Sequence, residues 1–163
     1  MTQTIPVRLA ARSYDVHAGP GLLQRAGDLI APFAPSGRVF VVTDRNVAEA
    51  HLQTLITGLG RLDARHVFVL EPGEHTKSYD GLQTLLSGLL AANISRKDIV
   101  IAFGGGVIGD LAGLAAGLVK RGVDFVQIPT TLLAQVDSSV GGKTAIDTPE
   151  GKNIVGLIHQ PRL

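Results

Sequence analysis

The strongest constraint on the fold is a regular alternation of short, β-branched apolar runs with longer segments rich in Leu and Ala. The apolar runs are nearly uninterrupted, which is typical of strands covered on both faces of a sheet. They span residues 38–43, 66–70, 98–103 and 125–128. The segments between them, residues 47–59, 78–92 and 107–119, place apolar side chains at helical spacing. The alternation predicts an α/β fold with a parallel sheet flanked by helices.

The two ends of the chain are less regular than its middle. Residues 7–9 and 14–18 indicate an N-terminal edge β-hairpin, and residues 22–30 a helix. After Pro129 the sequence is polar and rich in Gly, and we expect a loop-rich stretch there. Residues 136–163 should be the least stable part, because their glycines lower local stability. The length, 163 residues, predicts one domain.

Composition excludes several classes of function. The 15 Lys and Arg residues balance 14 Asp and Glu residues, so no basic surface for nucleic acid is expected. The chain has no Cys, which excludes disulfides, a thiol nucleophile and a Cys-based zinc site. Its longest apolar stretch, residues 111–119, is far shorter than the ~20 residues of a membrane span. We therefore expect a soluble, cytoplasmic protein with neither a membrane nor a nucleic-acid partner.

Polar or glycine-rich segments follow each of the four predicted strands. In open parallel sheets, ligands bind beyond the carboxyl ends of the strands. The segments are residues 44–46, 71–74, 104–106 and 130–131. We expect them to converge on one ligand site.

The residues from Gly104 to Gly109 match the pattern G-x-G-x-x-G, directly after a strand and at the start of a helix. Bare backbone there lets a pyrophosphate approach the amide groups of a helix N-terminus, as in Rossmann-like folds. The alternative is that the glycines only permit a tight turn and close helix–sheet packing. The context favours a ligand, although the motif follows a late strand rather than the first.

Two carboxylates near this motif have two interpretations each. Asp44 is placed to hold ribose hydroxyls, or to form an Asx turn or a helix N-cap before Val47. Asp110 is expected in the first turn of the glycine-led helix, where the macrodipole favours a carboxylate by ~0.3–1 kcal/mol. It could instead contact a ligand ribose or amide. The sequence leaves these alternatives open.

A second constellation lies in the loop-rich stretch that follows. Gly141 to Thr144 resemble the end of a P-loop, but Asp137 occupies the position of its first Gly, which excludes that motif. Asp137, Lys143, Lys152 and Asn153 could form an anion pocket or a solvated surface network. The five histidines lie at positions without metal-pair spacing on a helix, and each is expected at the surface. No G-x-S-x-G elbow of a hydrolase is present.

Residues 71–161 resemble the 3-dehydroquinate synthase family, and the combination of motifs in this order is specific. The earlier residues match more loosely, mainly through Asp44-Arg45-Asn46. The matching segments are PGEHTK (72–77), GGGVIGDLAG (104–113), KRGV (120–123), QIPTTLL (127–133), VDSSVGGKTAI (136–146), GKNIVG (151–156) and HQP (159–161).

This resemblance implies an NAD-dependent lyase of the shikimate pathway. The family converts 3-deoxy-D-arabino-heptulosonate 7-phosphate to 3-dehydroquinate and phosphate, by transient oxidation, phosphate elimination, re-reduction and aldol cyclisation. A divalent metal, zinc or cobalt, is bound by a Glu and two His in a second, helical domain. Residues 1–163 therefore correspond to the NAD-binding domain without that C-terminal domain. We expect no metal ligands in this chain and no turnover by it alone.

The resemblance also assigns roles to individual positions. The residues that match substrate contacts are Arg121, Asp137, Lys143 and Asn153, and Arg121 would reach the site of a neighbouring subunit in a homodimer. The residues that match NAD contacts are Asp44, Asn46, Glu74, Lys77, Gly105, Gly106, Val107, Asp110, Thr130, Thr131 and Lys152. A phosphosugar acid needs several cations, and Lys143, Lys152 and Arg121 would supply them.

Three alternatives to this function remain open on the sequence. One is another sugar phosphate cyclase that makes an inosose or a valiolone. A second is an iron- or zinc-dependent alcohol dehydrogenase, which would release NADH. A third is a free-standing nucleotide-binding module without catalysis.

Overall fold

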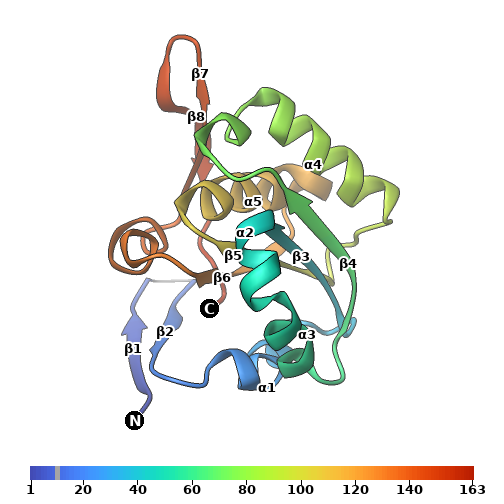
Figure 1. Ribbon diagram of the computed structural model, residues 1–163, viewed down its shortest axis with the longest axis vertical. Coiled ribbons are helices and arrows are strands. Elements are labelled where there is room, and N and C mark those ends of the chain that lie inside the picture. Colours follow the sequence, from blue (N-terminus) through green and yellow to red (C-terminus); the bar gives the residue numbers. More distant parts are fainter. Residues whose placement is uncertain (10–11) are drawn as a thin grey trace.

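A four-stranded parallel sheet lies between two helical layers in the computed structural model, which describes residues 1–9 and 12–163 (Figure 1). The strand order is β4-β3-β5-β6. The strands are β3 (Arg38–Asp44), β4 (Asp63–Leu70), β5 (Ile99–Gly104) and β6 (Asp124–Pro129). All neighbouring pairs are parallel, so the predicted α/β fold is confirmed.

Alternation along the central strands determines which helices cover which face. In β5, Val100 and Ala102 pack toward α4 (Tyr79–Ala91) and α5 (Gly106–Leu118). Ile99, Ile101 and Phe103 pack on the other face with residues of α1 (Ala26–Ile30) and α3 (Gln53–Leu59). Because both faces are buried, every residue of β5 is apolar or Gly. The apolar sequence of β5 alone therefore indicates that helices cover both faces of the sheet.

The order of the strands creates a switch point between β3 and β5. The chain runs from β3 to its neighbour β4, and then crosses to the opposite side of β3 to form β5. The connections that leave the carboxyl ends of β3 and β5 therefore pass over opposite faces of the sheet. A crevice opens where such connections diverge, and it is the usual ligand position in open α/β sheets.

The helices on the α1 face are more broken than the sequence predicts. The predicted helix 22–30 is split into η1 (Leu23–Arg25), α1 and η2 (Ala31–Phe33). The predicted helix 47–59 begins earlier, with α2 (Arg45–Val47), and continues through a π-type turn, η3 (Ala48–Leu52), into α3. Close packing of the two segments accounts for part of this, since a Cβ on Gly58 would lie 1.8 Å from the Leu23 carbonyl oxygen.

The N-terminal hairpin is confirmed, but its first strand is shifted. β1 (Gln3–Val7) pairs with β2 (Tyr14–Ala18), whereas the sequence suggested residues 7–9. Leu9 belongs to the turn, because the Ser13 hydroxyl bonds to both its N–H and its carbonyl oxygen. The hairpin forms a sheet of its own. The C-terminal segment forms backbone hydrogen bonds with the edge strand β6, where the Arg162 N–H donates to the Phe125 carbonyl.

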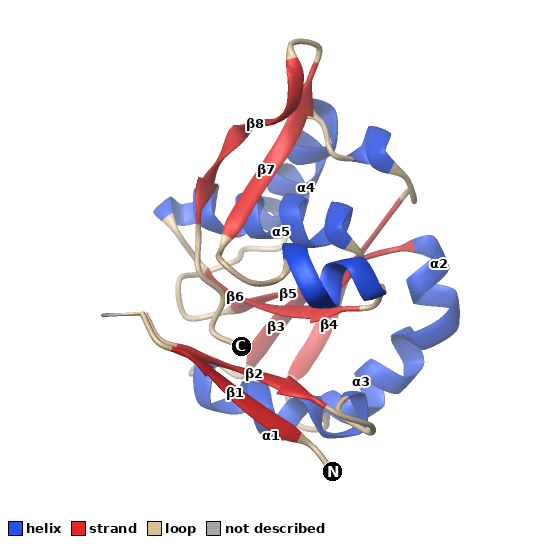
Figure 2. Ribbon diagram, turned by 90° about the vertical axis from the view of Figure 1, so that its left-hand side faces the viewer, coloured by secondary structure: helices blue, strands red, loops and turns tan. Residues whose placement is uncertain are grey.

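The stretch after Pro129, expected to be rich in loops, contains regular elements that the sequence did not predict. After the short helix η6 (Ala134–Ser138), β7 (Lys143–Thr148) and β8 (Gly151–Ile158) form an antiparallel hairpin. It stands at the opposite end of the molecule from β1 and β2 (Figure 2). The hairpin packs on α5 at Gly113, where a Cβ would come within 2.5 Å of the Thr144 methyl group. Glycine thus permits this contact.

Within the described ranges, 1–9 and 12–163, no helix is both long and apolar enough to cross a bilayer.

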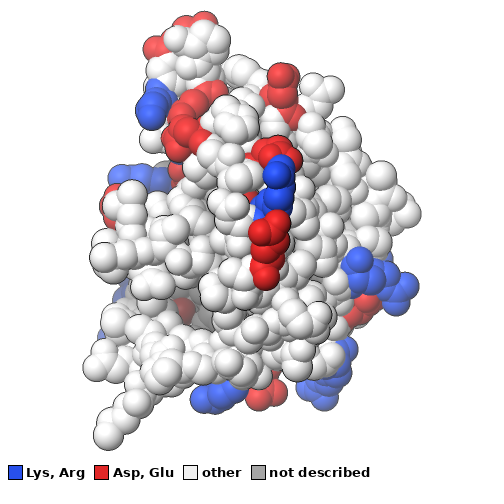
Figure 3. Space-filling model, in the orientation of Figure 1, with Lys and Arg blue, Asp and Glu red and all other residues white. Residues whose placement is uncertain are grey.

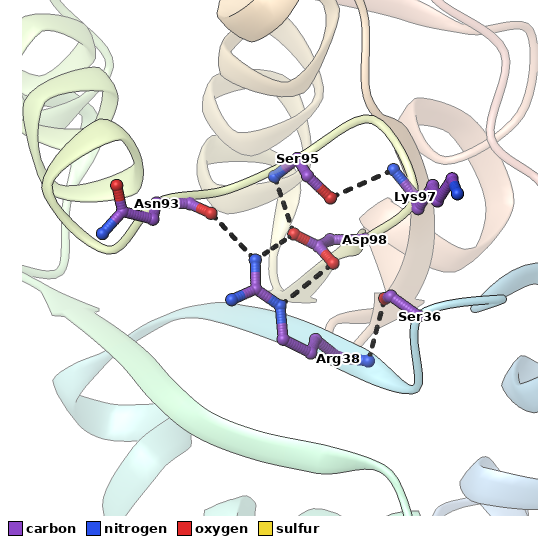
Figure 4. A network of polar contacts seen from close by, with 6 residues as sticks. All are labelled: Ser36, Arg38, Asn93, Ser95, Lys97 and Asp98. Carbon is purple, nitrogen blue, oxygen red and sulfur yellow. Dashed lines mark hydrogen bonds and ion pairs between the residues drawn. The ribbon is translucent and has the colours of Figure 1, made fainter.

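A buried ion pair joins β3 to the start of β5 at the amino ends of the strands (Figure 4). Both Asp98 carboxylate oxygens accept from the Arg38 guanidinium, and the Ser95 N–H donates to the same carboxylate at 2.7 Å. Arg38 also donates to the Asn93 carbonyl at 2.8 Å. Burial acts to raise the pKa of Asp98, but these donors outweigh it and lower the pKa to about 2.

This network predicts acid-sensitive stability. An Asp98 pKa below the unfolded value of about 3.9 stabilises the fold above pH ~4, and this stability is lost as pH falls toward 2. Asp98→Asn should lower the free energy of unfolding by about 2–3 kcal/mol at pH 7. Urea titrations of both proteins should show the difference narrowing between pH 4 and 2. Asp15→Asn, on exposed strand β2, is the control; a gap that does not change with pH would contradict the assignment.

Candidate functional site

A cleft of about 320 Å³ lies at the switch point between β3 and β5. The segments after β3, β4, β5 and β6 all reach it, as the sequence predicts. Seven of the eleven predicted cofactor residues line it: Asp44, Asn46, Gly105, Gly106, Val107, Thr130 and Thr131. The structure therefore brings these residues together on one side of the sheet, and what they bind stays a prediction.

The floor of this first cleft is the start of α5. Gly105 is the N-cap residue and has no side chain to cap the helix, and no acidic residue lies in the first turn. The amides of the first turn therefore lack partners within the helix and give its N-terminus a positive partial charge. A phosphate placed in the cleft would meet these amides without competition from a side chain.

The glycines of the G-x-G-x-x-G motif divide into two groups. A Cβ on Gly104 would lie 2.7 Å from the Ile108 side chain, and one on Gly109 would lie 2.8 Å from the Gln127 Oε1 atom. These two glycines permit packing, which confirms that interpretation for them. Gly105 and Gly106 face the cleft instead. The motif therefore serves packing at its ends and leaves backbone accessible between them.

The paired threonines have different environments. The Thr131 hydroxyl is already used, because it accepts a hydrogen bond from the Ala134 N–H at 3.2 Å. The Thr130 Oγ1 atom is buried and has no hydrogen-bond partner among the described residues. A buried hydroxyl without a partner carries a desolvation cost of about 1–3 kcal/mol.

Asp44 caps the N-terminus of α2, which is one of the two roles that the sequence allows for it. Its Oδ1 atom accepts from the Val47 N–H at 3.0 Å at the start of α2. Capping does not conflict with ligand binding, because a carboxylate has two oxygens and several lone pairs. An ion pair between Arg45 and Glu71 links the segments that follow β3 and β4.

A second cleft, of about 610 Å³, is formed by η6, the β7–β8 hairpin and one side chain of α5. It brings together Asp137, Lys143 and Asn153, three of the four residues predicted to contact substrate. Asp110 lines the same cleft from α5. A hairpin that the sequence did not predict thus brings these residues together, and their role in binding an anion stays a prediction.

Lys77 is buried next to this second cleft and is surrounded by carboxylates. Its Nζ atom lies 2.7 Å from an Asp110 oxygen and 3.9 Å from oxygens of both Glu74 and Asp147. Burial raises the pKa of Asp110, and Lys77 partly opposes this rise. The expected position of Asp110 in the first turn is wrong: α5 begins at Gly106, so Asp110 is stabilised by Lys77 rather than by the helix end.

Other predicted residues lie outside these two clefts. Glu74 and Lys77 line an adjoining hollow with Asp147, after the short helix η4 (Glu74–Thr76). Lys152 is exposed on β8. Arg121, in η5 (Val119–Arg121), follows the far end of α5, whose 13 residues span about 20 Å. Arg121 is therefore remote from the cleft that its own chain forms at the start of α5.

Sequence reasoning missed Asp147, which contacts both Lys77 and the β8 turn. A single carboxylate in a short alternating strand gives no signal of its own. It also placed His159 at the surface, whereas this side chain is buried and stacked on Phe125 at 5.0 Å between ring centroids. In the described part of the chain, no three His, Cys, Asp or Glu side chains gather as a metal site would require.

Charges are mixed on the face of the molecule drawn in Figure 3. Lys and Arg lie among Asp and Glu, and no broad area of one sign appears on that face. The view thus contains no extended basic surface of the kind that binds nucleic acid.

The strand order and the glycine-led helix define a class, the Rossmann-like α/β domain, and its solved structural neighbours include sugar phosphate cyclases. The structure of 2-deoxy-scyllo-inosose synthase complexed with carbaglucose-6-phosphate, NAD+ and Co2+ matches 98% of this chain and 43% of its own, with a TM-score of 0.89 and 28% identity. That of 2-epi-5-epi-valiolone synthase from Streptomyces hygroscopicus, with NAD+ and Zn2+ bound, matches 96% and 43%, with a TM-score of 0.83 and 31% identity.

Within this class, the chain belongs to the 3-dehydroquinate synthase family. Residues 67–163 match the family described as 3-dehydroquinate synthase N-terminal. The 3-dehydroquinate synthase of Rhodospirillum rubrum is 58% identical over 99% of this chain, and that of Caulobacter vibrioides is 55% identical over 100% of this chain. The chain spans 42% and 45% of these relatives, less than half of their length.

The dehydrogenase alternative is supported at the level of the fold alone. An iron-containing alcohol dehydrogenase from Thermotoga maritima matches 86% of this chain and 42% of its own, with a TM-score of 0.66 and 23% identity.

Proposed function

We propose that residues 1–163 are the NAD-binding domain of a 3-dehydroquinate synthase. The observation that carries this proposal is the cleft at the switch point, where residues from four separate loops meet at the uncapped start of α5. Family membership and the solved relatives with NAD+ support the same ligand.

The residues present fit NAD. The first-turn amides of α5 would hold the pyrophosphate beside Gly105, Gly106 and Val107, and Thr130 would give its partnerless hydroxyl to the ligand. Asp44 and Asn46, which line the same cleft, would bind ribose hydroxyls. Glu74, Lys77, Asp110, Thr131 and Lys152 complete the proposed contacts. When bound, NAD supplies reversible hydride acceptance from a substrate alcohol.

The second cleft is proposed to hold the substrate, 3-deoxy-D-arabino-heptulosonate 7-phosphate, which becomes 3-dehydroquinate and phosphate. Lys143 would bind an anionic group, and Asp137 and Asn153 would orient hydroxyls or carbonyl oxygens. This conversion is a step of the shikimate pathway. We propose a cytoplasmic location for the protein on the same basis. Asp110 lines this cleft and pairs with Lys77, so it links substrate-side and cofactor-side groups.

The divalent metal, zinc or cobalt, is proposed to have its ligands in the part of the family's proteins that this chain does not span. The described residues offer no cluster to hold it. We therefore assign no metal-dependent step to the residues of this chain.

Another sugar phosphate cyclase is the second candidate, because the solved inosose and valiolone synthases share this fold closely. The 52–58% identity to 3-dehydroquinate synthases, against 28–31% to those two, favours the first candidate.

The cofactor assignment is tested by titrating NAD into the chain calorimetrically. The unmodified chain should bind NAD, and Asp44→Asn should weaken binding about tenfold, because a charged acceptor for the ribose hydroxyls is lost. Asn is also a good N-cap, so unfolding free energy should stay within about 0.5 kcal/mol. Asp44→Ala should lose both affinity and stability. Equal NAD affinity in all three proteins would remove Asp44 from the cofactor site.

Catalysis is tested separately from binding. Residues 1–163, given NAD, zinc or cobalt and the heptulosonate phosphate, should release no phosphate, because the proposed metal ligands lie elsewhere. A full-length protein that contains this chain should release phosphate without accumulating NADH. Net accumulation of NADH would instead support the dehydrogenase alternative. Phosphate release by residues 1–163 alone would refute the proposal that catalysis needs metal ligands outside this chain.

The remote position of Arg121 fits a role across a subunit interface. Lys120 and Arg121 both have left-handed backbone (φ 53° and 63°), which is uncommon for residues other than Gly. We propose that Arg121 reaches the substrate site of a second copy in a homodimer. Sedimentation equilibrium should give about twice the 17.1 kDa chain mass. A monomer at all accessible concentrations would contradict this proposal for the chain.

A further inference from the structure

Asp147 lies at an irregularity in the β7–β8 hairpin. Ile146 pairs with Val155 and Thr148 pairs with Gly151, so Asp147 alone faces residues 152–154 on the other strand. A bulge of this kind bends the strand and redirects side chains, and bulges are often found beside functional sites. The side chain of Asp147 is 18% exposed, so it is largely enclosed by its neighbours.

The first contact of Asp147 holds the backbone of Asn153. The Asn153 N–H donates to the Asp147 Oδ1 atom at 2.9 Å. Asn153 has a φ of 57°, in the left-handed region that residues other than Gly seldom adopt. A fixed acceptor on the opposite strand stabilises this conformation, and with it the directions of Asn153 and the adjacent Lys152.

The second contact of Asp147 is with the buried lysine. The Asp147 N–H donates to the Lys77 carbonyl at 2.9 Å, and the Lys77 Nζ atom is 3.9 Å from Asp147 Oδ1. Lys77 in turn pairs with Asp110 at 2.7 Å. One residue therefore touches both the segment that carries Lys77 and the turn that carries Lys152 and Asn153.

The charge of Asp147 agrees with these contacts. Burial acts to raise its pKa, but the hydrogen bond from Asn153 and the positive charges of Lys77 and Lys152 lower the pKa overall. The carboxylate is therefore ionised at neutral pH, with acceptor capacity for the Asn153 amide.

We infer that Asp147 is a positioning residue, which fixes the Lys152–Asn153 turn relative to Lys77 and so aligns the substrate-side hairpin with the cofactor cleft. This inference rests on the proposed function for its consequence, because Lys77 and Lys152 are proposed NAD contacts. Its geometric part, the support of Asn153 by Asp147, can be measured without any ligand.

The test compares Asp147→Ala with Asp147→Asn in the 163-residue chain. The amide of Asn keeps an oxygen that can accept from the Asn153 N–H, whereas Ala has none. Hydrogen exchange at the Asn153 amide should be at least tenfold faster in the Ala variant and within about threefold of the parent in the Asn variant. Calorimetry should show NAD binding weakened about tenfold by Ala and about twofold or less by Asn. Asp15→Ala, on exposed β2, is the matched control.

A second substitution separates positioning from general destabilisation. Glycine adopts left-handed backbone without side-chain support, so Asn153→Gly added to Asp147→Ala should restore most of the NAD affinity. Loss of structure would not be repaired in this way. If Asp147→Ala does not fold, the same comparison is made with Asp147→Ser at a temperature below its melting point.

The outcomes distinguish the inference from the function on which it rests. If the parent chain does not bind NAD, the proposed function fails, and the exchange rates alone decide the geometric claim. Unchanged Asn153 exchange in Asp147→Ala overturns the geometric claim, and unchanged NAD affinity in a chain that binds NAD overturns the positioning role of Asp147. Faster exchange with rescue by Asn and Gly supports it.

Discussion

The divergence of the chain at the carboxyl ends of β3 and β5 is the constraint on which the candidate site depends. The loops that follow the four parallel strands all lie at one edge of the sheet. Because the strand order reverses at β3, the loops after β3 and β5 diverge to opposite faces. Asp44 and Gly105 stand on either side of the resulting crevice. Because the strands are fixed by a core on both faces, this arrangement does not need a ligand to form it.

The sequence predicted the sheet because burial on both faces leaves little choice of residue. In β5, every position from Ile99 to Phe103 is buried, so the strand is an apolar run bounded by Asp98 and Gly104. The polar residues that follow such strands are then visible against the apolar background, and their convergence follows from the parallel arrangement. Local chemistry acts in the same way at the start of α4, where the Ser78 hydroxyl caps the helix by accepting from the Gly81 N–H.

What the sequence could not show depends on contacts between distant segments. The β7–β8 hairpin exists where Gly113 of α5 leaves room for Thr144, about thirty residues further along the chain. Buried His159 has no local signal either, because its place is set by Phe125 and by the Val123 carbonyl at 2.9 Å. Asp147 acquires meaning only when the hairpin brings it beside Lys77. In each case the partner lies too far along the chain for periodicity to reveal it.

The lysines near the two clefts differ in how far neighbouring carboxylates balance their charge. Lys77 has three carboxylates within 3.9 Å of its ammonium group, so its charge is more than balanced before any ligand arrives. A phosphate would be repelled there, and Lys77 is suited instead to orienting Asp110 and neutral ligand groups. The uncapped start of α5 and Lys143, which is exposed in the second cleft, offer positive charge that carboxylates do not already balance in this way. The two clefts thus differ in chemistry, and the Lys77–Asp110 pair joins the second cleft to the hollow beside η4.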